Sequence, residues 1–223
     1  MDLAGGVAVR VAALCLDDHG RPSQRFAADA AVRAGLLLDL ALTGRVESTD
    51  DSIVVDETPT GFAPADGLLA AIVVEPERSL DGWLDERRIG LREVADAAVR
   101  SGRWELRHRF PHPRFRDLAA EQTEADAVRD ASTGSDGWSP EDAAVTALAL
   151  VAGLLRRPAG SVAEAYGETP APPVPESVLA RAGDVRWLCE AVTDHIAAAR
   201  ANDLAAAAAL RAGSWSYGQA QIY

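Results

Sequence analysis

Arginine side chains are concentrated in one stretch of this chain, and their chemistry is that of anion binding. Residues 87–116 hold nine arginines against three acids, so the stretch carries +6 within a chain of net charge −12. A guanidinium binds phosphate oxygens through two parallel hydrogen bonds, and charge of one sign gathered locally indicates an anion-binding surface. The nine arginines are Arg87, Arg88, Arg92, Arg100, Arg103, Arg107, Arg109, Arg114 and Arg116.

Apolar groups lie among these arginines. Residues 104–110 predict a strand, Pro111-His112-Pro113 forces a turn, and residues 114–116 predict a returning strand. Trp104, Phe110 and Phe115 lie in this predicted hairpin. The combination suits a surface that meets phosphate groups beside apolar material.

Other site chemistries find little support in the sequence. His108 and His112 stand close together, but prolines interrupt any helix there and no third ligand is near, so we expect no metal site. Asp85 and Glu86 are better interpreted as a solvated helix face than as a catalytic acid pair. Neither a Ser-His-Asp order nor a glycine-rich phosphate loop is present. We therefore expect no catalytic residues, no cofactor and no enzymatic activity.

Composition limits the classes of partner and compartment. The acidic balance argues against broad nucleic-acid binding and against unaided adsorption to an anionic bilayer. Cys15 and Cys189 lie in apolar surroundings, which favours buried free thiols over a disulfide. Neither a signal-peptide pattern nor a membrane-spanning apolar run is present, so we expect a cytoplasmic protein.

The hydrophobic pattern predicts a mainly α fold with small hairpins. Residues 25–42 and 139–155 are the most apolar predicted helices and should be central. Residues 7–16 could form a strand or a short helix. The predicted strands 45–48 and 52–55 follow a helix, which leaves a winged-helix DNA binder as an alternative that the acids beside them oppose. The remaining predicted helices are 68–74, 80–87, 91–100, 117–130, 184–199 and 203–211.

Five blocks of sequence occur in an order and spacing that are typical of one protein family. They are LCLDDHGRP at 14–22, AVRAGLLLDLALTGR at 31–45, TPTG at 58–61, GLRE leading to RSG at 90–102, and an apolar run at 140–155. Together they resemble the Golgi phosphoprotein 3 family, in its short actinobacterial form. The resemblance is good over residues 7–157 and loose over 158–211, with 212–223 expected as a loose tail of the same single domain, 1–223.

This resemblance implies a fold and a binding function. It implies a central apolar helix ringed by amphipathic helices, with one projecting hairpin at about residues 104–115. Eukaryotic relatives are peripheral membrane proteins that read phosphatidylinositol 4-phosphate and bind the cytosolic tails of glycosyltransferases. The hairpin tip would contact lipid, which places the protein peripherally on the inner membrane face. The tip residues are Phe110, Pro111, His112 and Pro113.

The resemblance also implies which residues bind the headgroup. In the eukaryotic proteins a tryptophan and three arginines do so. Arg33 matches the first arginine and Arg88 the second, whereas Leu91 falls at the third with Arg92 beside it. Gln24 falls at the tryptophan. The predicted ligand-binding set is therefore Arg33, Arg88, Arg92 and Gln24, which departs from the family at two positions.

Two alternatives stay open at this point. The arginines of the set could instead pair with nearby acids such as Asp29, Glu86 or Glu93 on solvated helices. The leading hypothesis is a non-enzymatic domain that binds an anionic phospholipid headgroup, with protein tails as further partners. The alternative is a protein–protein adaptor without lipid activity, in which the hairpin mediates self-association or docking.

Overall fold

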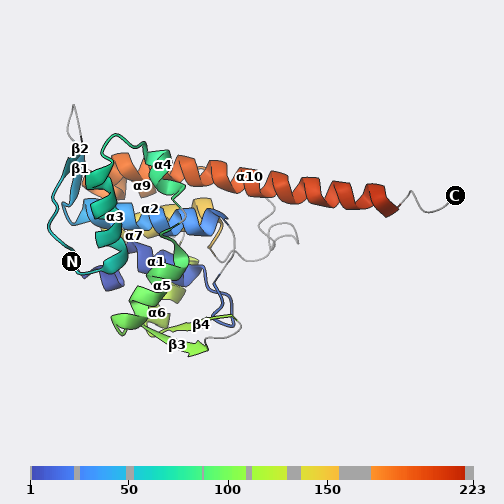
Figure 1. Ribbon diagram of the computed structural model, residues 1–223, viewed down its shortest axis with the longest axis horizontal. Coiled ribbons are helices and arrows are strands. Elements are labelled where there is room, and N and C mark those ends of the chain that lie inside the picture. The colour runs from blue at the N-terminus through green and yellow to red at the C-terminus, as the bar shows by residue number, and fades with distance from the viewer. Residues whose placement is uncertain are drawn as a thin grey trace.

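The computed structural model describes residues 2–22, 26–48, 53–86, 88–108, 112–129, 137–155 and 172–218 (Figure 1). These form a mainly helical fold with two small antiparallel hairpins, as the sequence predicts. The strands are β1 (Val46–Ser48), β2 (Ile53–Val55), β3 (Trp104–His108) and β4 (Arg114–Asp117). The helices are η1 (Leu3–Gly5), α1 (Val7–Leu14), α2 (Phe26–Leu42), α3 (Ala63–Val74), α4 (Leu80–Leu84), α5 (Leu91–Arg100), α6 (Ala120–Val128), α7 (Pro140–Ala152), α9 (Glu176–Leu179), η2 (Ala180–Val185) and α10 (Arg186–Gly218).

Helix α2 is the central element. Its residues 27–40 are buried on nearly every side, with Ala30, Leu36 and Leu40 fully inaccessible to solvent. Helices α1, α3, α5, α7 and α10 pack around it. A helix that is apolar all round can be stable only inside the molecule, so the prediction of a central apolar helix is confirmed.

Helix α7 begins and ends where its sequence directs. The Ser139 hydroxyl accepts the N–H of Asp142 at 3.1 Å, and the Asp142 carboxylate accepts the N–H of Ser139 at 3.1 Å. This reciprocal cap precedes a buried run from Ala143 to Ala152. Gly153, at φ 71°, ends the helix in the left-handed region that glycine tolerates.

The β3–β4 hairpin stands at the far side of α5 from α2 (Figure 1). Leu106 is paired with Phe115 across the strands, and Trp104 lies 5.8 Å from Phe115 between ring centroids. The N–H of Phe115 also donates to the carbonyl oxygen of Gly20 at 2.8 Å, so the turn at 17–22 is joined to β4. Buried aromatic rings therefore fix the base of the hairpin to the body of the domain.

One open alternative is settled, and several bounds differ from the prediction; α3, for example, begins at Ala63 and not at residue 68. The ambiguous segment 7–16 is a helix, α1, up to Leu14. Helix α4 ends at Leu84, short of the predicted residue 87, and the Glu86 carboxylate then accepts the N–H of Arg88 in a tight turn. The two predicted C-terminal helices are one, α10, because no glycine or proline separates them. Helix α10 continues to Gly218, into residues predicted as a loose tail.

The structure also bears on the two cysteines and on membrane-spanning segments. Cys15 and Cys189 are both buried free thiols, as predicted. Burial raises the pKa of each thiol to about 12, so both remain protonated and unreactive. Among the described residues, no helix is both long and apolar enough to cross a membrane.

Candidate anion-binding site

Arg33 is buried beneath the loop that joins α4 to α5. Its side chain extends from the middle of α2, and only 3% of the residue is exposed. The Nε atom donates to the carbonyl oxygen of Leu84, and Nη1 donates to that of Ile89 at 3.2 Å. These carbonyls stand at the two ends of the loop 85–89, so one guanidinium fixes where the loop leaves α4 and where it enters α5.

Asp29, one helical turn before Arg33, fixes the start of α5. Its Oδ1 atom accepts the N–H of Leu91 at 2.9 Å. A Cβ atom at Gly90 would lie 2.7 Å from that same oxygen and 3.7 Å from Arg33 Nη1, so only glycine fits there. Glu93 accepts the N–H of Gly90 at 3.0 Å. Two carboxylates therefore occupy this helix N-terminus, and an external anion would have to bind the guanidinium groups.

Arg88 and Arg92 are exposed on either side of this junction. Arg88 lies in the loop, and its backbone N–H lowers the pKa of Glu86 by bonding to that carboxylate. Arg92 lies in the first turn of α5. Among the described residues, neither guanidinium forms a salt bridge. The alternative of close ion pairs with Glu86 or Glu93 is not seen as a salt bridge among the described residues, although the charge of Arg88 also lowers the pKa of Glu86.

A hollow of about 530 Å³ lies between α5 and the hairpin. Arg92, Asp96 and Arg100 reach it from successive turns of α5. Its apolar lining consists of Val99, also from α5, Leu106 from β3 and Pro113 from the hairpin turn. Two guanidinium groups facing one carboxylate leave the hollow basic, so it suits an anion attached to an apolar group.

The hairpin extends this basic character. We define the unpaired arginine group as the arginines of the loop, α5 and the hairpin whose guanidinium forms no salt bridge with a described residue. Arginines elsewhere, such as Arg10, Arg45 and Arg186, lie within 4 Å of carboxylates. The members of the group are Arg88, Arg92, Arg100, Arg103, Arg114 and Arg116.

The structure places the remaining predicted site residues unevenly. His112 is exposed and Pro113 is half-buried at the rim of the basic hollow. Phe110, Pro111 and Gln24 lie outside the described residues. The loop and α5 bring Arg88 and Arg92 to the surface above Arg33, which the order of the sequence blocks could not show.

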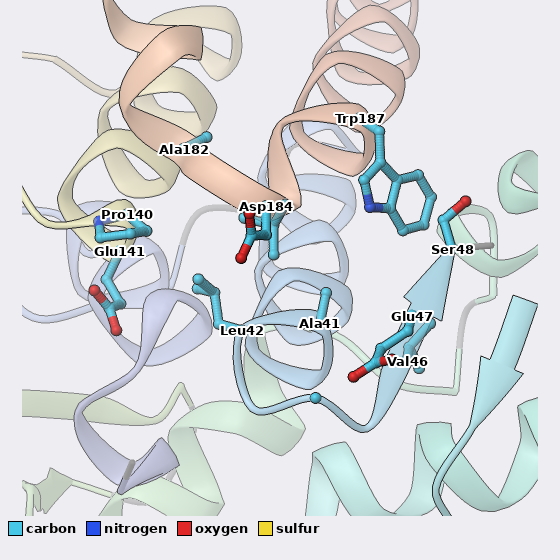
Figure 2. Close-up of a pocket in the computed structure, with 12 residues that line it drawn as sticks. Ala41, Leu42, Val46, Glu47, Ser48, Pro140, Glu141, Ala182, Asp184 and Trp187 are labelled. Atoms are coloured by element: carbon cyan, nitrogen blue, oxygen red, sulfur yellow. The ribbon is translucent and has the colours of Figure 1, made fainter. Parts of the chain in front are cut away.

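Sequence reasoning missed a second, acidic hollow of about 640 Å³ (Figure 2). The end of α2, strand β1, the start of α7 and the η2–α10 junction enclose it. Glu47, Glu141 and Asp184 line it, the ring of Trp187 forms one wall, and Leu42 lies on the floor. Four separate segments contribute, so no local pattern in the sequence indicated this hollow.

Comparison with known families agrees with this architecture. A family model described as Golgi phosphoprotein 3 (GPP34) matches residues 10–212. The chain belongs to this family. The match includes residues 158–211, which the sequence blocks fit only loosely. No curated protein matches the chain. The Golgi phosphoprotein 3 family is not an enzyme family, and its members bind lipids and protein partners.

Proposed function

We propose that the chain binds the phosphate of an anionic phospholipid headgroup without chemically converting the lipid. The observation that carries the proposal is the unpaired arginine group. Arg88 and Arg92 are exposed and form no salt bridge with a described residue, and Arg92 lines a basic hollow with an apolar part. Guanidinium groups without carboxylate partners gain most from phosphate oxygens, because no existing ion pair has to break.

The burial of each arginine indicates its role in binding. Arg88 and Arg92 contact the phosphate, whereas Arg33 supports the loop from below through two backbone carbonyls. The hairpin turn, with Pro113 at the rim of the hollow, lies toward the lipid. Phosphatidylinositol 4-phosphate is the first headgroup to test, because the resemblance in sequence implies that Arg33 and Arg88 occupy two positions of the family's headgroup site.

The charge of the whole chain sets the form of the binding. A net charge of −12 repels an anionic bilayer, so only a face carrying local positive charge can approach it. The bilayer then attracts only this basic face, and the attraction is strong only when the face is in contact with the headgroups. Salt should reduce it, because exposed charges are screened over about 8 Å at physiological ionic strength.

Vesicle flotation tests this proposal. Purified protein is mixed with phosphatidylcholine vesicles, alone or with phosphatidylinositol 4-phosphate or cardiolipin, at low and high salt. We expect salt-sensitive flotation with an anionic lipid, and its loss in Arg88→Ala/Arg92→Ala. The charge-matched control is Arg181→Ala/Arg186→Ala, outside the unpaired arginine group, which should float like the wild type. Undiminished flotation of the first double variant would reject the site.

A protein-docking function is the second candidate, and the acidic hollow favours it. Glu47, Glu141 and Asp184 form no salt bridge with described residues, and they line the same hollow as the half-buried Trp187, so the hollow suits a cation beside an apolar group. A partner with a basic segment would suit it. An arginine-rich peptide should then bind the wild type and Arg88→Ala/Arg92→Ala equally, and bind Glu47→Gln/Asp184→Asn more weakly. The opposite pattern would exclude the hollow as the docking site.

A further inference from the structure

Strand β1 has one edge that pairs with β2 and a second edge that borders the acidic hollow. The paired edge has the register that places Glu47 opposite Val54. Val46, Glu47 and Ser48 all line the hollow, although successive side chains of a strand point to opposite faces. Three consecutive residues can border one hollow only if the hollow meets the edge of their strand. Figure 2 shows β1 running along one side of the hollow in this way.

The outward backbone groups of this edge belong to Val46 and Ser48. The N–H of Asp56 donates to the carbonyl oxygen of Arg45 at 2.9 Å. Bonded and non-bonded pairs alternate along an antiparallel ladder, so the next bonded pair is the one that includes Glu47. Val46 and Ser48 therefore direct their N–H and C=O groups away from β2, where no described residue bonds them. Such a row of groups is a template for a further strand.

The side chains around this edge determine which partner suits it. Glu47 projects from β1 itself, Asp184 lines the hollow from η2, and Glu141 lines it from the first turn of α7. Leu42 and the half-buried Trp187 supply its apolar surface. Oppositely charged side chains that face each other across neighbouring strands stabilise the pairing. An added strand should therefore carry basic side chains, with apolar ones between them.

A second copy of this chain does not suit the edge. When a three-residue strand pairs antiparallel with its own copy in the centred register, the two Glu47 side chains lie opposite each other. Like charges in this position destabilise a sheet. Each copy also carries a net charge of −12, which opposes association through an acidic face. The occupant is therefore a different chain of opposite charge.

We propose that the free edge of β1 binds an extended basic peptide as a third strand. The peptide backbone bonds the outward groups of Val46 and Ser48, while arginine or lysine side chains lie beside Glu47 and Asp184. Main-chain bonds then supply affinity, and the charged side chains supply specificity. This inference rests on the docking function proposed above for the acidic hollow, because it specifies how the partner occupies that site.

Methylation of the peptide backbone tests strand addition on the wild-type protein. The probe is a short fluorescent peptide of alternating arginine and valine, followed by fluorescence anisotropy. Alternate residues of a strand direct their N–H groups to opposite edges, so N-methylation of either the arginines or the valines blocks one edge only. We expect one methylated form to bind about tenfold more weakly than the unmodified peptide, and the other to bind like it. Equal binding of the two forms overturns strand addition.

Substitution of Ser48 tests the same bond from the side of the protein. Ser48→Pro removes the outward N–H but no donor of the ladder with β2, and proline is tolerated at such edge positions. Ser48→Ala is the matched control, because it loses the hydroxyl and keeps the N–H. We expect Ser48→Pro to bind the unmodified peptide about fivefold more weakly than Ser48→Ala, with thermal unfolding confirming that both are folded. Equal affinities of the two folded variants contradict the inference.

Glu47→Gln/Asp184→Asn separates this inference from the docking function. Suppose that this variant binds the unmodified peptide more weakly, while both methylated forms bind the wild type equally. The acidic hollow then docks a basic partner through its side chains alone, and only strand addition is rejected. If the unmodified peptide does not bind the wild type, the docking function fails and the inference fails with it.

Discussion

Asp39, in the middle of α2, caps helix α1 by accepting the N–H of Val7 at 2.7 Å. Its second oxygen accepts the N–H of Ala8 at 3.0 Å. A Cβ atom at Gly6 would lie 2.5 Å from Asp39 Oδ1, so the close approach requires glycine. The one acid in the apolar half of α2 thus satisfies two backbone donors of α1, and it joins the two helices at a fixed register.

Asp39 should make stability depend on pH in an unusual direction. Burial raises its pKa to about 7, although the two N–H bonds oppose this rise. In the unfolded chain its pKa is about 4, so between about pH 4 and 7 the folded state holds a proton that the unfolded state lacks. The contribution of protonated Asp39 to the free energy of unfolding is therefore lost as the pH rises from about 4 to about 7.

The substitution Asp39→Asn isolates this effect, because asparagine does not titrate. We expect the advantage of the wild type over Asp39→Asn to shrink by about 3 kcal/mol between pH 5 and pH 8. Urea unfolding of both proteins at the two pH values measures it. The same difference at both values would mean that Asp39 remains ionised throughout.

Arg33 should prove as important for stability as for binding. In Arg33→Ala the carbonyls of Leu84 and Ile89 lose a buried donor, so we expect a loss of about 2–4 kcal/mol in the free energy of unfolding. Arg33→Lys keeps the charge but not the planar fork, and it should lose less. Urea unfolding ranks the three proteins. An Arg33→Ala protein as stable as the wild type would show that the guanidinium does not hold the loop.

Sequence patterns predicted the elements that local chemistry determines. Helix α2 follows from an apolar run with no polar face, and α7 from the cap at Ser139. The β3–β4 hairpin follows from the prolines at its turn. In each case the deciding residues lie within a few positions of one another, so one sequence was enough.

The contacts of the candidate site depend on pairs distant in sequence. Asp29 and Arg33 stand four residues apart and suggested a helical ion pair. Instead, Asp29 caps α5. Arg33 donates to the carbonyl oxygens at the two ends of the loop after α4, on residues 51 and 56 positions further along the chain. Those loop groups lack partners of their own, and buried backbone donors and acceptors must find one. Only the tertiary arrangement shows which side chain supplies it.

Asp126 should be essential to the attachment of α6. Its carboxylate is fully buried, with Arg10 Nη2 at 2.7 Å and Arg129 Nη1 at 2.6 Å. Asp126→Asn would leave Arg10 and Arg129 to share the carboxylate of Asp142, and we expect a loss of about 2–3 kcal/mol in the free energy of unfolding. The control is Glu176→Gln, which breaks the exposed pair with Arg186 and should change stability little. Similar effects from both substitutions would contradict this ranking.

Gly20 should be irreplaceable because it joins the turn at 17–22 to the hairpin. It has φ 72°, and a Cβ atom there would lie 2.0 Å from the carbonyl oxygen of Phe115. Gly61 has φ 81° but open space around it, so Gly61→Ala measures the conformational cost alone, about 1 kcal/mol. We expect Gly20→Ala to lose at least about 2 kcal/mol more. Thermal unfolding compares the two variants, and equal decreases in unfolding temperature would mean that the hairpin can move away from the added Cβ atom without loss of stability.

The far half of α10 should be dispensable for folding. Among the residues of α10 whose burial is described, Arg200 is the last buried one, and Ala201 and Asn202 are exposed. The helix then projects away from the body (Figure 1). A helical segment with few buried residues adds little to the stability of the domain, because helical stability in proteins comes mostly from tertiary packing. A chain ending at Asp203 should therefore unfold in urea within about 0.5 kcal/mol of the full chain, while circular dichroism shows the lost helix. A much larger loss would show that this segment packs against the domain in solution.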